Sequence, residues 1–158
     1  MEPKYKRILL KLSGEALAGD KKIGLDYDVI TSFGKSIKKC VDAGVEVGIV
    51  VGGGNFWRGR TSENMERTKA DQIGMLATVM NCIYTSEIFR SVGMKTEIFT
   101  PFACGAMTKL FSKDEANACF AEKKVAFFAG GTGHPYFSTD TTTVLRAIEI
   151  EAETILLA

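Results

Sequence analysis

The sequence lacks the patterns that mark several large classes of protein. Its 158 residues include four cysteines without any Cys-x-x-Cys pair, which argues against a zinc site or a disulfide framework. Its longest apolar runs are about five to seven residues, far short of the roughly 20 that cross a bilayer. The formal net charge is +1, so no overall field favours nucleic acid or a membrane surface. The first residues, 1–7, contain no apolar core of a secretory signal. We therefore expect a cytoplasmic protein with reduced, mostly buried thiols that binds neither nucleic acid nor membrane.

Several familiar catalytic and nucleotide-binding motifs are also missing. The Gly-x-x-x-x-Gly-Lys-Ser/Thr spacing of a P-loop does not occur. Gly52-Gly53-Gly54 follows an apolar run but lacks the Gly-x-Gly-x-x-Gly spacing, which disfavours a nicotinamide cofactor. His134 is the only histidine, and no cysteine or acidic cluster accompanies it as a zinc site would require. No serine and acid pattern completes a hydrolase triad around it.

What the sequence does contain is a regular alternation of apolar runs and segments of helical period. The hydrophobic share of 46% with 25% charged residues is ordinary for a globular domain, and the length allows one proper core. Strands alternating with helices predict an α/β fold, a three-layer αβα sandwich with a mainly parallel central sheet. Predicted strands lie near 8–10, 45–51, 95–99, 125–128 and 154–157, and predicted helices at about 26–43, 68–91, from 112, and 139–152.

Glycine and hydroxyl residues gather in three segments that each follow a predicted strand. These segments are 11–14, 52–55 and 130–140. Glycine lets backbone N–H groups approach an anion closely, and a strand, a glycine turn and a helix start form a usual phosphate site. Ligands of parallel sheets bind beyond the carboxyl ends of the strands. We therefore expect the three segments to meet at one edge of the sheet and hold a phosphate.

Individual charged residues in these segments allow more than one interpretation. Lys11 either places its ammonium over a phosphate or is a surface lysine at a strand end. Arg58 and Arg60 either neutralise phosphate oxygens or are solvated. Asp71, expected in the first turn of the long helix, either interacts with the helix dipole or accepts hydrogen bonds from a sugar. Asp140 is either a helix N-cap or a residue that holds Mg²⁺ or orients a basic side chain.

Four motifs, in order, resemble the bacterial uridylate (UMP) kinases of the amino acid kinase superfamily. They are residues 6–17 (KRILLKLSGEAL), 52–59 (GGGNFWRG), 70–81 (ADQIGMLATVMN) and 131–140 (GTGHPYFSTD). The resemblance implies an amino acid kinase-like fold and the reaction UMP + ATP → UDP + ADP with Mg²⁺, in pyrimidine nucleotide supply. It also implies a cytoplasmic homohexamer that GTP activates and UTP inhibits.

The resemblance also implies roles for particular residues. The expected catalytic residues are Lys11, Arg58 and Asp140. The expected ATP-binding residues are Lys11, Leu12, Ser13, Gly14, Gly54 and Arg58. The expected UMP-binding residues are Gly53, Asp71, Thr132, Gly133, His134, Pro135, Tyr136, Phe137, Ser138 and Thr139. The stretch Lys22, Ile23, Gly24, Leu25 and Asp26 resembles the GTP-responsive region. No residue is expected to hold a metal by itself, and Mg²⁺ is expected to arrive with ATP.

Two departures from the family pattern shape the expectations. The family usually has asparagine at the position of His134, which we expect to tune UMP binding rather than perform acid–base chemistry. Family chains also continue into a segment that holds the adenosine of ATP. The run 154–157 reads as a central strand with nothing after it, so we expect residues 1–158 to be the UMP-binding portion of a longer protein and nearly inactive alone. The alternatives are a non-catalytic nucleotide-binding module, or an amino acid kinase acting on a carboxylate or carbamate.

Overall fold

A single sheet of six parallel strands forms the centre of the protein. The computed structural model describes residues 2–58 and 64–158. The strands lie in the order β4-β3-β5-β2-β1-β6, and every neighbouring pair is parallel. Their bounds are β1 Arg7–Leu12, β2 Glu46–Val51, β3 Lys95–Thr100, β4 Lys109–Leu110, β5 Lys124–Phe128 and β6 Thr154–Leu157.

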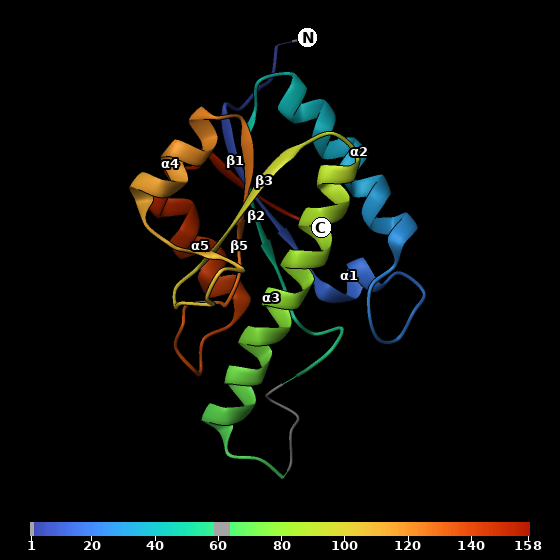
Figure 1. The fold of residues 1–158 in the computed structure, drawn as a ribbon, viewed down its shortest axis with the longest axis vertical. Helices are drawn as coiled ribbons and strands as arrows, with labels where there is room; N and C mark the ends of the chain where they lie inside the picture. The colour runs from blue at the N-terminus through green and yellow to red at the C-terminus, as the bar shows by residue number, and fades with distance from the viewer. Residues whose placement is uncertain (1, 59–63) are drawn as a thin grey trace.

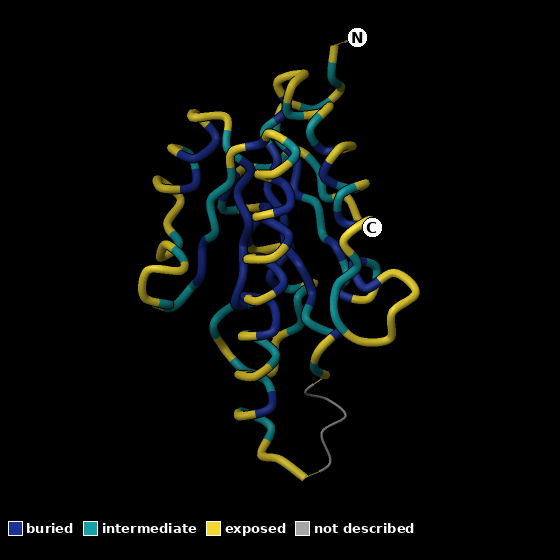
Figure 2. Tube along the Cα trace, turned by 45° about the vertical axis from the view of Figure 1, so that its right-hand side comes forward, coloured by how far each residue is buried: buried dark blue, intermediate teal, exposed yellow. Residues whose placement is uncertain are grey.

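Helices cover both faces of this sheet, which confirms the predicted three-layer α/β fold. Helices α2 (Tyr27–Asp42) and α3 (Arg67–Ser91) pack on one face. Helices α4 (Lys113–Ala121) and α5 (Thr139–Glu149) pack on the other, and the short α1 (Gly14–Ala18) follows β1. Figure 1 shows the sheet between helices α4 and α5 on one side and α2 and α3 on the other. The buried residues concentrate along the strands and the inward sides of the helices (Figure 2).

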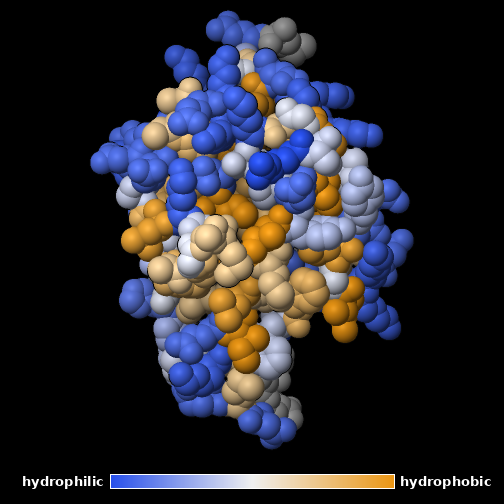
Figure 3. Space-filling model, in the orientation of Figure 1, coloured by the Kyte–Doolittle hydropathy of each residue, from blue (hydrophilic) through white to orange (hydrophobic). Residues whose placement is uncertain are grey.

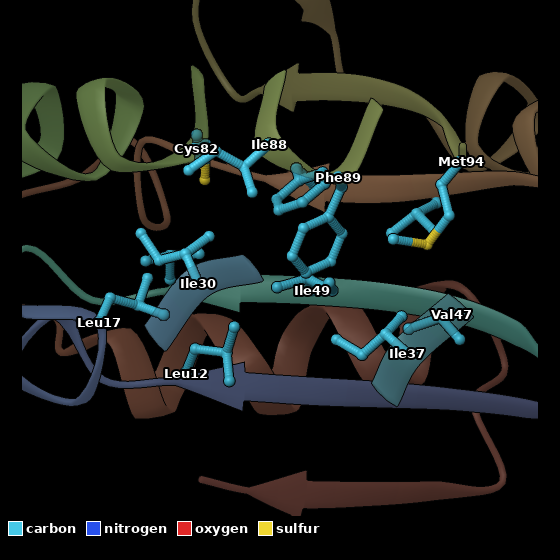
Figure 4. Close-up of a cluster of buried hydrophobic side chains, with 14 of the residues drawn as sticks. Leu12, Leu17, Ile30, Ile37, Val47, Ile49, Cys82, Ile88, Phe89 and Met94 are labelled. Carbon is cyan, nitrogen blue, oxygen red and sulfur yellow. The ribbon is translucent and has the colours of Figure 1, made fainter. Parts of the chain in front are cut away.

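Two apolar clusters, one on each face, bind the layers together. The larger cluster joins α2 and α3 to the sheet through residues such as Ile30, Phe89 and Ile49 (Figure 4). The Phe89 and Phe127 rings meet edge to face with centroids 5.4 Å apart. Full burial of side chains of this size stabilises a fold by roughly 1.5–3 kcal/mol each, so these contacts fix the strands that carry the loops.

The predicted helix boundaries agree with the capping interactions. Asp26 caps α2 by accepting hydrogen bonds from the backbone N–H groups of residues 28 and 29. Gly44 and Gly93, with φ of +91° and +93°, follow the ends of α2 and α3 as predicted. The Ser112 hydroxyl accepts a hydrogen bond from the Glu115 N–H, so the predicted start of α4 is confirmed.

Three features of the fold differ from the sequence prediction. Helix α1 forms where no helix was predicted, and Ser13 caps it by accepting a 3.0 Å hydrogen bond from the Ala16 N–H. The two-residue β4 is too short to leave a periodic signal. Strand β6, expected in the centre of a sheet, pairs only with β1 and lies at the sheet edge within the described part of the chain.

Helix α3 presents an apolar stripe outward. Ile73, Leu76, Met80, Ile83 and Tyr84 recur at helical spacing, and each is at least a third exposed. An apolar area crosses the middle of the face on which α3 lies (Figure 3). No helix in the described residues is both long enough and apolar enough to cross a membrane.

Candidate active site

A cavity of about 490 Å³ lies at the carboxyl ends of β1, β2 and β5. The three glycine-containing segments all contribute to it, so their predicted convergence is confirmed. A parallel sheet places the ends of neighbouring strands together, which is why distant segments meet there. The lining residues are Lys11, Ser13, Gly14, Glu15, Gly52, Gly53, Gly54, Trp57, Arg58, Arg67, Asp71, Gly74, Met75, Thr78, Gly131, Thr132, His134, Phe137, Ser138, Thr139 and Asp140.

The loop after β2 is held in place by two buried asparagines. The Asn81 side-chain amide donates a 2.7 Å hydrogen bond to the carbonyl of Gly52 and another to Oδ1 of Asn55. Gly14 packs against the same loop so closely that a Cβ there would lie 2.4 Å from Asn55 Oδ1. The backbone of residues 11–14 therefore packs so closely against the loop after β2 that position 14 has no room for a side chain.

Helix α3 also anchors the segment that follows β5. The buried Thr78 hydroxyl accepts a 2.8 Å hydrogen bond from the Gly130 N–H and donates to the carbonyl of Met75. Gly130, Gly131 and Gly133 have φ of +80°, +62° and +81°, a region that side chains rarely adopt. Helix α3 thus positions two of the three glycine segments, the one after β2 and the one after β5.

Three cation–carboxylate pairs line the cavity. Lys11 Nζ lies 3.2 Å from Asp140 Oδ1, and Arg67 Nε lies 2.8 Å from Asp71 Oδ2. The Arg58 guanidinium contacts the Glu15 carboxylate. These side chains give the cavity a nearly balanced charge, so a phosphate that enters must compete with carboxylates for the cations.

Two of the open interpretations are decided by the geometry. Asp140 is not an N-cap, because Ser138 caps α5 by accepting a hydrogen bond from the Thr141 N–H. Asp140 lies in the first turn of α5, beside Lys11. Asp71 is not in the first turn of α3, which begins at Arg67, so the predicted interaction of Asp71 with the helix dipole is wrong. Asp71 instead accepts hydrogen bonds from Arg67 and from the Tyr136 N–H.

The carboxylates of the cavity fit a magnesium ion that enters with a nucleotide. Within the described ranges, no three His, Cys, Asp or Glu side chains group closely enough to hold a metal. Mg²⁺ commonly takes one or two carboxylates together with substrate phosphates rather than a full protein cage. Asp140, three-quarters exposed at the cavity rim, provides a carboxylate of this kind.

The thiols take no part in the cavity. Cys82 and Cys119 are buried, and burial raises the pKa of each to about 12, so both stay protonated at neutral pH. Cys104 is half-buried and Cys40 is exposed, so the expectation of a buried thiol is wrong for Cys40. All four are free cysteines.

Comparison with known proteins identifies the family of this chain. Residues 6–158 match the model of the amino acid kinase family. The chain belongs to the amino acid kinase family. It is 33% identical to UMP kinase from Bacillus anthracis, with a TM-score of 0.93, over 99% of this chain and 65% of that one. It is 30% identical to UMP kinase from Ureaplasma parvum, with a TM-score of 0.91, over 99% of this chain and 67% of that one.

Within this amino acid kinase chain, most of the predicted site residues line the cavity. Leu12 does not, because its side chain points into the core between the sheet and α2. Gly133, Pro135 and Tyr136 belong to the loop around the cavity without lining it. Arg60 lies outside the described residues. The ligand assigned to each residue remains a prediction.

Some lining residues were not predicted. Glu15, Trp57, Arg67 and Thr78 come from positions that sequence patterns present as ordinary helix or loop. The Trp57 indole N–H donates a 2.8 Å hydrogen bond to the carbonyl of Ala70, which ties the loop after β2 to α3. The spacing of Arg67 and Asp71 at i and i+4 was the available signal for that pair.

The predicted GTP-responsive stretch, residues 22–26, lies outside the cavity between α1 and α2. Ile23 is 74% exposed there. The carbonyl of Gly24 accepts a 2.7 Å hydrogen bond from Asn55, so the stretch is joined to the loop after β2. Its response to GTP stays a prediction.

Proposed function

We propose that this chain carries the acceptor side of a UMP kinase, which transfers the γ-phosphoryl group of ATP to UMP in pyrimidine nucleotide supply. The main support is the meeting of Lys11 and the two glycine loops in one cavity beside the strand ends. The similarity to two UMP kinases supports the choice of substrate. The chain spans only about two thirds of those proteins, and the complete reaction is part of the proposal.

The reaction depends on positioning the two substrates and neutralising the charge on the transferring phosphoryl group, and it needs no strong base. A phosphate oxygen of UMP, already anionic, attacks the γ-phosphorus, and the bond to the β,γ-bridging oxygen breaks to release ADP. Lys11 and Arg58 neutralise the charge on the transferring group, while backbone N–H groups of the glycine loops hold the phosphates. Asp140 orients the Lys11 ammonium across their 3.2 Å contact.

Bound Mg²⁺ would neutralise the polyphosphate further, and Asp140 is the residue we propose to face it. On the acceptor side, Gly53 contacts the UMP phosphate and residues 132–139 enclose the nucleotide. Asp71 accepts a hydrogen bond from its ribose. His134 lines the cavity and tunes UMP binding without transferring a proton.

Two other functions remain to be separated from this one. A related kinase would phosphorylate a carboxylate or carbamate, and a regulatory module would bind nucleotide without turnover. ADP release should therefore be measured with UMP, CMP, AMP, glutamate and carbamate as acceptors, and UMP and ATP binding should be titrated separately by calorimetry. Turnover with UMP and with none of the other acceptors supports the proposal. A preference for glutamate or carbamate as the acceptor overturns it. Binding of both nucleotides without turnover indicates the non-catalytic module, whereas UMP binding without ATP binding is the result expected if this chain supplies only the acceptor side.

Lys11→Met supplies the matching test of the site, with the exposed Lys35→Met as its control. We expect Lys11→Met to lose at least about a hundredfold in kcat, as removal of a charge-stabilising group typically does, while the control keeps its rate. An unchanged kcat in Lys11→Met would place the chemistry elsewhere.

We further propose a cytoplasmic homohexamer that GTP activates and UTP inhibits. The outward apolar stripe on α3 supports contact between copies, because the free energy falls when a partner covers exposed apolar side chains. Leu76→Glu should lower the mass measured by light scattering, whereas Gln72→Glu, an equal charge on an exposed polar position, should not. Titration of the activity with GTP and UTP tests the effectors.

A further inference from the structure

The carboxylate of Asp71 divides its two oxygens between the protein and the cavity. Oδ2 accepts a 2.8 Å hydrogen bond from Arg67 Nε and another of 2.8 Å from the Tyr136 N–H. Among the described residues, none donates a hydrogen bond to Oδ1. The Asp71 side chain lines the cavity and is 15% exposed. One oxygen is therefore occupied by the fold, and the other is available to a ligand.

Arg67 joins Asp71 to the loop after β5 by a second contact. Its guanidinium lies over the Tyr136 ring, 5.0 Å from the centroid. Tyr136 has a φ of +71°, which is strained for a residue with a side chain. The hydrogen bond to Asp71 and the contact with Arg67 offset that strain. These three residues, which we call the Arg67 clamp, connect positions 65 apart in the sequence.

The location of Arg67 is poorly suited to stabilising α3 itself. Arg67 is the first residue of the helix, where the positive end of the dipole disfavours a cation. A basic residue four positions before an acidic one is also the weaker order for a helical ion pair. Helix stability thus gives no reason for an arginine here, whereas the contacts with Asp71 and Tyr136 do.

We propose that Arg67 is a positioning residue that sets the acceptor's sugar specificity through Asp71. By holding Oδ2, it fixes the plane of the carboxylate so that Oδ1 faces a sugar hydroxyl. Its charge also offsets that of Asp71, so the carboxylate does not repel the nucleotide phosphate. A site built to accept a hydrogen bond from a substrate hydroxyl disfavours a ligand that lacks this hydroxyl, so the clamp distinguishes UMP from its deoxy forms. This inference rests on the proposed UMP kinase function.

The test compares Arg67→Met and Arg67→Lys with Asp71→Asn, using Arg90→Met on the exposed end of α3 as the control. Activity is measured with UMP, 2′-deoxy-UMP and 3′-deoxy-UMP. We expect Arg67→Met to raise the KM for UMP by at least about tenfold, the loss of one hydrogen bond to a charged group. The preference for UMP over one deoxy form should fall by a similar factor, with the KM for ATP unchanged. Arg67→Lys should recover part of the preference.

An independent measurement needs no nucleotide. The Tyr136 N–H should exchange with solvent faster in Arg67→Met and Asp71→Asn than in Arg90→Met, as followed by NMR. Unchanged exchange overturns the clamp whatever the substrate is. If the wild type uses UMP and Arg67→Met keeps its sugar preference, the inference fails and the proposed function stands. If the wild type neither binds nor phosphorylates UMP, the proposed function fails, and with it the sugar specificity.

Discussion

The side-chain amides of Asn55 and Asn81 hydrogen-bond to each other in both directions, at 3.1 and 2.7 Å. Each also reaches a backbone carbonyl, Asn55 that of Gly24 and Asn81 that of Gly52. Because both side chains are buried, water cannot replace a lost partner. The pair therefore joins α3, the loop after β2 and the connection between α1 and α2.

Replacing Asn81 by leucine should destabilise the protein and loosen the loop after β2. The change removes the donor to the Gly52 carbonyl and to Oδ1 of Asn55, and each buried acceptor left without a donor costs about 1–3 kcal/mol. The free energy of unfolding, measured in urea, should fall by a similar amount. Glu87→Gln, on the exposed side of the same helix, is the control. Equal stability of the two variants would show that the asparagine pair does not hold the loop.

Alanine should be tolerated less well at Gly14 than at Gly54. A Cβ at Gly14 would lie 2.4 Å from Asn55 Oδ1 and 2.8 Å from the Gly52 carbonyl, and neither atom can move freely. A Cβ at Gly54 would lie 2.5 Å from the end of the Glu15 side chain, which can rotate away. Calorimetric phosphate or nucleotide binding should be lost in Gly14→Ala and retained in Gly54→Ala. The opposite ranking would contradict the packing described between the two loops.

Asp140→Asn should lower kcat with little effect on the KM for UMP. The amide keeps the shape of the side chain but removes the charge that orients Lys11, and Asp140 contacts Lys11 rather than the predicted acceptor loop. We expect a loss of about tenfold to a hundredfold, less than for Lys11→Met, because Lys11 itself remains. Steady-state kinetics on both variants provide the comparison. A rise in the KM for UMP alone would assign Asp140 to binding.

The buried thiol of Cys82 should make stability fall at alkaline pH. Burial raises its pKa from 9.0 to about 12, so above pH 9 the unfolded chain releases the proton and the folded chain does not. The folded state is thus favoured fully below pH 9 and loses up to about 1.4 kcal/mol per pH unit from this group above it.

Cys82→Ala isolates this contribution. Its unfolding free energy should fall less steeply between pH 9 and pH 11 than that of the wild type, although the smaller side chain lowers the absolute value. Cys40→Ala removes an exposed thiol and should keep the wild-type slope. Identical slopes in all three proteins would show that Cys82 ionises as readily in the folded state as in the unfolded chain.

The sequence by itself determined the fold class and the location of the site. Apolar runs alternating with helical periods lead to a parallel sheet, and glycines after three strands indicated one shared edge, because strand direction fixes where loops emerge. The caps at Asp26 and Ser112 were also readable, since they depend on neighbours within three residues. Local interactions of this kind do not depend on how distant parts of the chain pack, so they can be predicted from the sequence.

Only the tertiary structure decided how the charged side chains pair. The partners of Lys11 and Arg58, and Tyr136 as the second partner of Asp71, lie on other elements, so their sequence spacing carries no signal. The role of Asn55 with Asn81 as a buried link follows from packing that brings distant parts of the chain together. A capping or strand preference acts over a few residues, whereas a buried polar contact is set by how whole layers meet, and in this protein those contacts shape the cavity.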